Sequence, residues 1–408
     1  MKRYQWMGIM LSLVLLLCSC GTDKEVEKKA GESTSTPSAT ASVMPLISED
    51  EAFSEAEKIV KTMTIEQKVG QMFLVDLLQL DASPSVDGTA YKATDSMKQA
   101  IIDYHLGGVY LTKENIKSQK QTKKLVQNLQ ASVVSGSALY VAVEEDGGGE
   151  NSISAKVEDL KDTGYVTPKE MGQNMTANQI YESGKTIAGE LTKIGINLNL
   201  APVADLASDQ NPSYAMRCLG SDADGVADLL DDFVSGMREG GLSVTLRNFP
   251  GIGNVSVDVT ESIAENTDSL MTIRDTNFVP YASGIQAGAD CVMVSNAAYS
   301  KLTVKKVPAF MSQDIVTKLL REELGFDGIV MTSPLNDNVI ENNYTNEFAV
   351  VEAVKAGCDL IVLPGNFKEC YEALITAVEE GRIDEKVINT SVRRILQNKI
   401  QRGILVLE

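Results

Sequence analysis

Short apolar segments alternate with longer amphipathic segments along most of this 408-residue chain. The apolar segments are four to six residues long, which is the usual length of a buried strand. The eight expected strands are residues 71–76, 108–111, 139–144, 197–201, 242–246, 291–295, 329–332 and 360–363.

The segments between these strands carry apolar residues at helical spacing, so we expect each of them to form a helix. The expected helices are residues 50–62, 95–104, 117–134, 178–194, 223–240, 279–287, 312–324 and 346–356, followed by 367–380 and 384–401. Eight strands that alternate with helical crossovers favour a (β/α)8 barrel. A doubly wound open sheet is the second choice, because no G-x-G-x-x-G motif opens a helix after the first strand.

The first 48 residues differ in pattern from the rest. Lys2 and Arg3 precede a 12-residue apolar run, and a Leu-Cys-Ser-Cys sequence then ends at Cys20. This arrangement is typical of a bacterial lipoprotein signal peptide at 1–19, with Cys20 lipidated. A plain cleaved signal peptide is the alternative. Residues 20–48, rich in Ser, Thr, Ala, Lys and Glu, are expected to tether the barrel at 49–408 to the outer face of the cell membrane.

The chain is strongly acidic, with a formal net charge of -19 and an apolar fraction of 43%. Such a charge repels nucleic acid, so we expect no nucleic-acid partner. Four cysteines outside the signal region lack C-x-x-C spacing, and the chain has one histidine, His105. We therefore expect no zinc site. We also expect that the protein uses no other cofactor and is a monomer.

The side chains that follow the expected strands are mostly polar. In a (β/α)8 barrel these strand ends meet at one face and form the site. The residues that follow the expected strands of this chain are Asp76, Glu144, Glu145, Asp146, Asp205, Arg247, Asn248, Asn296, Ser333 and Pro364. Many carboxylates and few cations indicate a site for a polar ligand, and a metal-binding role for some of them is conceivable.

The stretch NFPGIGNVSVDVT at 248–260 resembles the signature loop of the family 3 glycoside hydrolases, in particular their bacterial β-N-acetylglucosaminidase branch. Phe249, Pro250, Gly251, Gly253 and Asp258 match the family residues. Further matches are MTIEQKVGQM at 63–72, LGGV at 106–109, NLAPVAD at 199–205, MRCLGSD at 216–222, LREELGFDG at 320–328, AGCDLI at 356–361 and SVRRIL at 391–396. The resemblance implies a (β/α)8 barrel and a retaining glycosidase mechanism.

The chemical residues of that family are replaced here. Ser333 stands where the family has its nucleophilic Asp, and Thr260 where it has the acid/base His that pairs with Asp258. At the sugar-binding positions, Asp205 and Arg217 match the family, whereas Glu144, Gly149, Arg247, Asn248 and Asn296 replace Asp, Arg, Lys, His and His. A neutral serine needs an adjacent base, and a threonine hydroxyl donates no proton usefully near neutral pH.

Three hypotheses follow. The first is a degenerate, non-catalytic barrel that binds a glycan, a peptidoglycan fragment or a protein partner. The second is an active β-N-acetylhexosaminidase whose carboxylates have moved, with Asp337 and Glu261 as candidates. The third is a solute-capture lipoprotein on the same scaffold. Fold does not decide between them, because one barrel supports many functions.

Overall fold

The computed structural model describes residues 47–133, 137–148, 153–155 and 166–407, all within the compact unit Pro45–Glu408. Eight parallel strands form one sheet in the order β10-β1-β2-β3-β4-β5-β7-β9. A parallel bridge between Met331 and Leu360 joins its two edges. The strands are β1 Phe73–Asp76, β2 Gly108–Tyr110, β3 Tyr140–Val143, β4 Leu198–Asn199, β5 Ser243–Phe249, β7 Cys291–Val294, β9 Ile329–Thr332 and β10 Ile361–Val362. The predicted (β/α)8 barrel is confirmed.

All eight strands lie at the predicted places, because both faces of each are buried and each therefore reads as an apolar run. The predicted end of the fifth strand was wrong. β5 continues past Leu246 to Phe249, since Arg247 bridges to Val203 and Phe249 pairs with Val294 of β7. Arg247 and Asn248 therefore belong to the strand itself, at a register shift that bends it.

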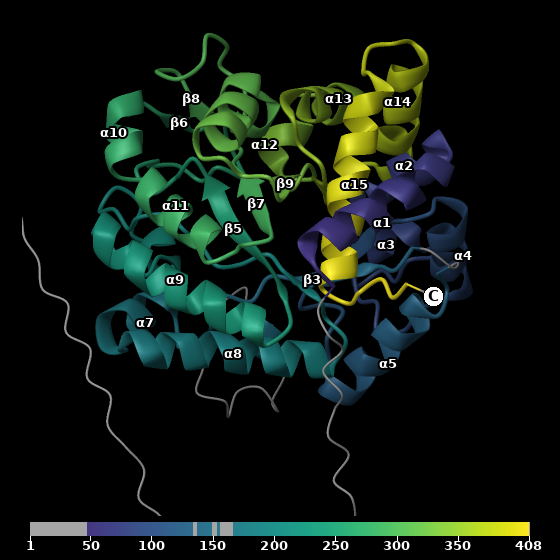
Figure 1. The fold of residues 1–408 in the computed structure, drawn as a ribbon, viewed down its shortest axis with the longest axis horizontal. Coiled ribbons are helices and arrows are strands. Elements are labelled where there is room, and N and C mark those ends of the chain that lie inside the picture. The colour runs from purple at the N-terminus through teal and green to yellow at the C-terminus, as the bar shows by residue number, and fades with distance from the viewer. Residues whose placement is uncertain (1–46, 134–136, 149–152, 156–165, 408) are drawn as a thin grey trace, which may run out of the picture. The chain divides into compact units, whose positions relative to one another are not determined.

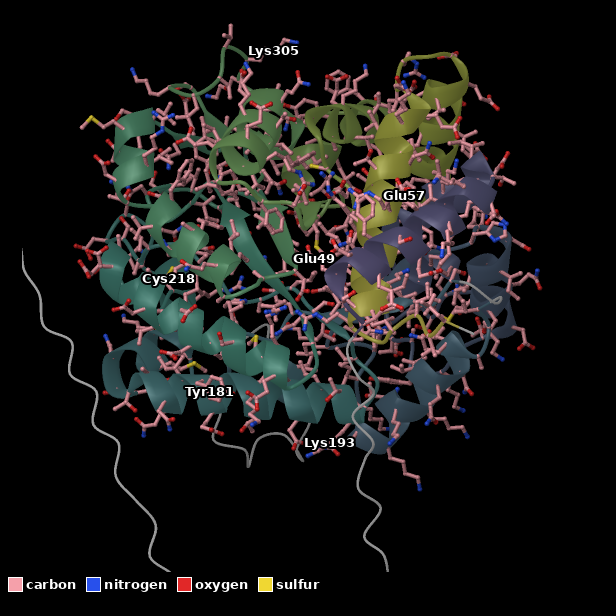
Figure 2. All side chains as sticks on the ribbon, viewed as in Figure 1. Glu49, Glu57, Tyr181, Lys193, Cys218 and Lys305 are labelled. Carbon is pink, nitrogen blue, oxygen red and sulfur yellow. The ribbon has the colours of Figure 1, made fainter. Side chains whose placement is uncertain are left out.

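Helices surround the barrel (Figure 1), and α8 lies beside α9. They are α1 Glu49–Thr62, α2 Ile65–Gln71, α3 Leu77–Leu80, α4 Asp95–Asp103, α5 Gln119–Gln130, α7 Pro168–Asn174, α8 Ala177–Lys193, α9 Ala223–Glu239, α10 Leu270–Asp275, α11 Phe278–Gln286, α12 Asn338–Glu341, α13 Asn346–Ala356, α14 Phe367–Glu379 and α15 Glu385–Gln401. Short turns η1 Ile153–Ala155, η2 Tyr214–Arg217 and η3 Ala309–Met311 accompany them, and the predicted helix at 312–324 is the wider-wound η4, Asp314–Glu323. Polar side chains such as Lys193 of α8 project outward (Figure 2).

The pattern missed several short elements. α3, α7, α10 and α12 have four to seven residues each, and the strands β6 Glu265–Asn266 and β8 Ala298–Tyr299 have two. Segments this short do not complete two helical turns or a run of alternation, so they leave little periodic signal. The sequence from Thr64 to Lys68 does predict a helix start, and Thr64 is the N-cap of α2. No helix in the described part of the chain is long and apolar enough to cross a membrane.

The terminal helix α15 closes the amino-terminal end of the barrel, and α1 packs against it (Figure 1). The Asn398 amide oxygen accepts hydrogen bonds from Tyr140 of β3 at 2.7 Å and from Ser243 of β5 at 2.9 Å. Lys399 Nζ donates to the Gly107 carbonyl at 2.8 Å. A cavity of about 480 Å³ lies at this end, lined by α1, α15 and the segments that precede β7 and β9. The carboxyl ends of the strands, at the other end of the barrel, are left for the site.

His105 lies at the amino-terminal end of the barrel, just before β2. Its backbone has a φ of 49°, and its carbonyl accepts a hydrogen bond from the Gln71 side chain at 2.7 Å. It is therefore on the opposite side of the barrel from Ser333, which follows β9. His105 therefore belongs to the scaffold at the amino-terminal end of the barrel.

Candidate active site

A network of two carboxylates and two arginines lies at the carboxyl ends of β3 and β5. Glu144 follows β3, Arg247 lies on β5, and Arg217 ends η2. Arg247 Nη1 is 2.6 Å from Glu144 Oε2, and Arg217 Nη2 bonds the other Glu144 oxygen. Arg217 Nε also donates to Asp146 Oδ2 at 2.9 Å. The four groups neutralise one another, so this part of the site has no excess charge.

Glu144 is the centre of that network, and its side chain is only 15% exposed. Burial alone would raise its pKa, but Arg247 and Arg217 outweigh burial and lower the pKa to about 2. Glu144 is therefore ionised at every physiological pH, and it acts as an acceptor and not as a proton donor. It also lines a cavity of about 230 Å³ together with Tyr110, Leu111, Thr112, Lys113 and Ile153. Typical ligand pockets have roughly 300–1,000 Å³, so this one suits a small group such as a single ring.

Asp205 is buried behind this network, with 1% of its surface exposed. It accepts hydrogen bonds from the Tyr214 hydroxyl at 2.5 Å and from the Tyr281 hydroxyl at 3.1 Å. The Asn248 amide donates to the same Tyr214 oxygen at 2.5 Å. Burial raises the pKa of Asp205 to about 6, although these hydrogen bonds oppose the rise. Asp205 and Asn248 thus hold Tyr214, three residues before Arg217. Neither tyrosine was predicted from the sequence, because neither follows an expected strand.

Ser333, at the nucleophile position, is 5% exposed. Its Oγ donates to the Val294 carbonyl at 2.9 Å, and its backbone N–H donates to the same oxygen at 3.0 Å. A carbonyl oxygen cannot take up the hydroxyl proton as a general base does. Ser333 therefore ties the end of β9 to the end of β7, and it does not line the 230 Å³ cavity beside Glu144.

Thr260 and Asp258 form a closed local turn in the loop after β5. The Thr260 hydroxyl and its backbone N–H both donate to Asp258 Oδ1 at 2.8 Å. The Thr260 carbonyl accepts the N–H of Val339 at 2.8 Å, and Glu261 accepts from the Asn338 amide at 2.9 Å. The loop is therefore docked on α12, the segment that follows Ser333. Its acid/base position holds a hydroxyl that is already committed to Asp258.

Asn296, which follows β7, lies beside Asp337. Its Nδ2 donates to Asp337 Oδ2 at 2.7 Å. Burial raises the pKa of Asp337 to about 7, with Asp258 and Glu144 adding to the rise and Asn296 and Arg247 opposing it. The three residues between Ser333 and Asp337 thus bring a second carboxylate to the barrel mouth, the end of the barrel where the strands have their carboxyl ends. It is close enough to Arg247 and Glu144 for their charges to affect its pKa.

Gly149 and Cys20, the remaining residues singled out in the sequence, lie outside the described residues. Asp76 caps its own helix, with Oδ1 accepting the Leu78 N–H at 2.7 Å. Within the ranges that the structure describes, no three His, Cys, Asp or Glu side chains are placed to hold a metal ion. The four described cysteines, Cys218, Cys291, Cys358 and Cys370, are free buried thiols.

The fold and the strand-end network define a (β/α)8 barrel with a polar site at the carboxyl ends of its strands. Residues 64–398 match the model of the glycosyl hydrolase family 3 N-terminal domain, and the chain belongs to this family.

Relatives agree with this assignment. The chain is 26% identical over 369 residues to "Beta-hexosaminidase A" of Pseudoalteromonas piscicida. This alignment covers 83% of this chain and 61% of that protein. It is 28% identical over 305 residues to the "Beta-hexosaminidase" of Stenotrophomonas maltophilia, 74% of this chain and 85% of that protein. Less than two thirds of the Pseudoalteromonas protein is therefore represented here.

Solved structures give the same result. A family 3 β-N-acetylglucosaminidase from Paenibacillus sp. str. FPU-7 superposes with a TM-score of 0.75 at 29% identity, over 85% of this chain and 64% of that one. The β-N-acetylhexosaminidase from Beutenbergia cavernae superposes with a TM-score of 0.71 at 28% identity, over 83% of this chain and 98% of that one.

Proposed function

We propose that this protein binds a hexosamine-containing glycan or peptidoglycan fragment at the barrel mouth without hydrolysing it. The observation that carries this proposal is the fixed hydroxyl of Ser333 at the nucleophile position, donated to the Val294 carbonyl. Retaining hydrolysis needs a carboxylate nucleophile and an acid/base group, which the resemblance places at positions 333 and 260. Ser333 and Thr260 supply neither.

Binding is supported by the groups that remain. Glu144 lines the small cavity of about 230 Å³, and Arg217 is paired with Glu144. Arg217 stands where the resemblance places a sugar contact. A carboxylate and a guanidinium offer sugar hydroxyls an acceptor and donors in a fixed orientation. The relatives named above are β-hexosaminidases, which favours a hexosamine as the ligand class.

We propose further that the barrel is held at the outer face of the cell membrane through lipidated Cys20. The support is the sequence pattern of residues 1–20, a basic start, an apolar run and a Leu-Cys-Ser-Cys end. Metabolic labelling with a palmitate analogue is expected to label the protein and to leave a Cys20→Ala variant unlabelled. Equal labelling of both would contradict the anchor.

Hydrolysis with a displaced carboxylate is the second candidate, and Asp337 is the observation that favours it. Its carboxyl group lies at the mouth, and burial raises its pKa to about 7, a value suited to a general acid or base. A hydrolase of this kind would need Asp337 and a second carboxylate on opposite sides of one glycosidic bond.

Turnover of an aryl β-N-acetylglucosaminide with a good leaving group separates the two candidates, because such substrates barely need the acid. We expect the full-length protein in detergent to show no turnover above its Ser333→Ala variant. We also expect an N-acetylglucosamine-containing muropeptide to raise the melting temperature of both proteins equally. Turnover that survives purification and is lost in Asp337→Asn would reject the binding protein in favour of the hydrolase.

A further inference from the structure

Two neighbouring groups at the barrel mouth, the Asn296 amide oxygen and the Asp337 carboxylate, have hydrogen-bond acceptor capacity that the described residues do not use in full. Asn296 is 1% exposed, and its Oδ1 has no hydrogen-bond partner among the described residues. A buried acceptor without a donor costs about 1–3 kcal/mol, so native structures rarely keep one without a reason. The other end of the same amide donates to Asp337 at 2.7 Å.

Asp337 is the second acceptor. It is the N-cap residue of α12, yet its side chain makes no capping hydrogen bond and turns to Asn296 instead. Within the described ranges no cation lies within 4.0 Å of its carboxylate, whereas Glu144, Asp146, Asp290 and Asp359 each have an arginine partner. Asp337 is partly exposed, so a ligand can reach it from solvent.

We propose that Asp337 and Asn296 bind a primary ammonium group, so that this site prefers an amino sugar whose amine is free to the same sugar in its N-acetylated form. This inference rests on the proposed function and narrows its ligand. An ammonium carries three donors and a positive charge, which match the lone pairs left open on the Asp337 carboxylate and on the Asn296 amide oxygen. An N-acetyl group has one N–H and an apolar methyl, and it leaves at least one of these acceptors without a donor.

The charges around Asp337 set the pH dependence of this binding. Arg247 faces it from β5, Glu144 from the end of β3 and Asp258 from the loop after β5, while Asn296 contacts it from β7. With its pKa at about 7, Asp337 is partly protonated near neutral pH. A bound ammonium favours the ionised form, so binding releases protons and tightens as pH rises from 5 to 6.5. The ligand amine titrates in the range of an α-amino group, about 7.7–8.0, so it keeps its charge throughout this window and loses it above it.

Calorimetric titration with glucosamine and N-acetylglucosamine, in two buffers of different ionisation heat at pH 6, where the amine is fully charged, tests this inference. We expect the full-length protein to bind glucosamine at least tenfold more tightly and to release a fraction of a proton. Asp337→Asn, which keeps the shape and the Asn296 contact, is expected to lose the preference and the proton release. Glu341→Gln removes a nearby exposed carboxylate outside the site and is the matched control, expected to keep both.

The titrations separate failure of the ammonium site from failure of the proposed glycan binding. Equal affinity for the two sugars, or a preference that Asp337→Asn retains, overturns the ammonium site and leaves glycan binding intact. Binding of neither sugar nor a muropeptide overturns the proposed function itself. If Asp337→Asn fails to fold, the proton release of the unchanged protein still decides, since a neutral acceptor site releases none.

Discussion

Glu144→Ala is expected to abolish sugar binding and to lower the free energy of unfolding by about 3–5 kcal/mol, the usual cost of removing one partner of a buried ion pair. Glu144 holds two guanidinium groups whose side chains are 11% and 21% exposed, those of Arg247 and Arg217. Asp146 remains as a partner for Arg217, but no second carboxylate pairs with Arg247 within the described residues. Two mostly buried cations would then share a single counter-charge.

Urea unfolding followed by circular dichroism measures this effect. Glu239→Ala is the matched control, because Glu239 pairs with Lys185 on the surface, where the two side chains are 53% and 42% exposed. Exposed pairs contribute about 0–1 kcal/mol, so the control should unfold almost as the unchanged protein does. If Glu144→Ala were as stable as Glu239→Ala and still bound sugar, the network would be neither structural nor part of the site.

Acid should reproduce part of the Glu144→Ala effect. The pKa of Glu144 in the folded protein is about 2, below its ordinary 4.5, so its stabilisation is complete above about pH 4.5 and is lost as pH falls towards 2. The difference in unfolding free energy between the unchanged protein and Glu144→Gln should therefore shrink over that window. A difference independent of pH would place the role of Glu144 in packing.

The sequence located the barrel because its signals are local. Each strand is a run of residues buried on both faces, and each long helix has a regular apolar stripe, so both can be read without knowing what they contact. The end of β5 was misjudged because Arg247 and Asn248 are polar residues within a strand. Their places depend on Val203 and Val294, from neighbouring strands.

The site was harder to predict, because its chemistry depends on partners from distant parts of the chain. The strand-end rule brought Glu144, Asp205, Arg247 and Asn296 together correctly. It could not show that Glu144 would be neutralised by two arginines, or that Tyr214 and Tyr281 would surround Asp205. Asp337 was noted only by its distance from Ser333 along the chain. The Asp337 side chain contacts Asn296 and does not cap α12, and this choice depends on a residue 41 positions earlier in the chain.

The second large effect concerns Lys399, a fully buried lysine at the closed end of the barrel. Its Nζ donates to Gln71 Oε1 at 2.9 Å and to the Gly107 carbonyl at 2.8 Å, and lies 4.8 Å from the centre of the Tyr140 ring. None of these partners is a carboxylate. Burial therefore lowers the pKa of Lys399 from 10.5 to about 7.

This shift predicts that stability rises with pH. Between pH 7 and pH 9 the unfolded chain keeps the lysine proton while the folded protein gives it up, so the unfolded state binds more protons and the unfolding free energy increases. The expected gain from this group is about 2 kcal/mol over those two pH units, at 1.36 kcal/mol for each full proton and pH unit. Burial keeps the pKa of the adjacent Tyr140 well above 10, so that phenol stays neutral throughout the window.

Lys399→Met keeps the length of the side chain and removes its charge, so the rise between pH 7 and pH 9 should be about 2 kcal/mol smaller in this variant. Lys355→Met, which removes an exposed lysine paired with Glu352, should follow the unchanged protein at every pH. Gln71 loses a hydrogen bond in Lys399→Met, and this lowers the free energy of unfolding by the same amount at each pH. The slope of the unfolding free energy against pH is therefore unaffected by that loss. Parallel slopes in Lys399→Met and the unchanged protein would mean that Lys399 stays protonated in the folded barrel, held by its two carbonyl acceptors and the Tyr140 ring.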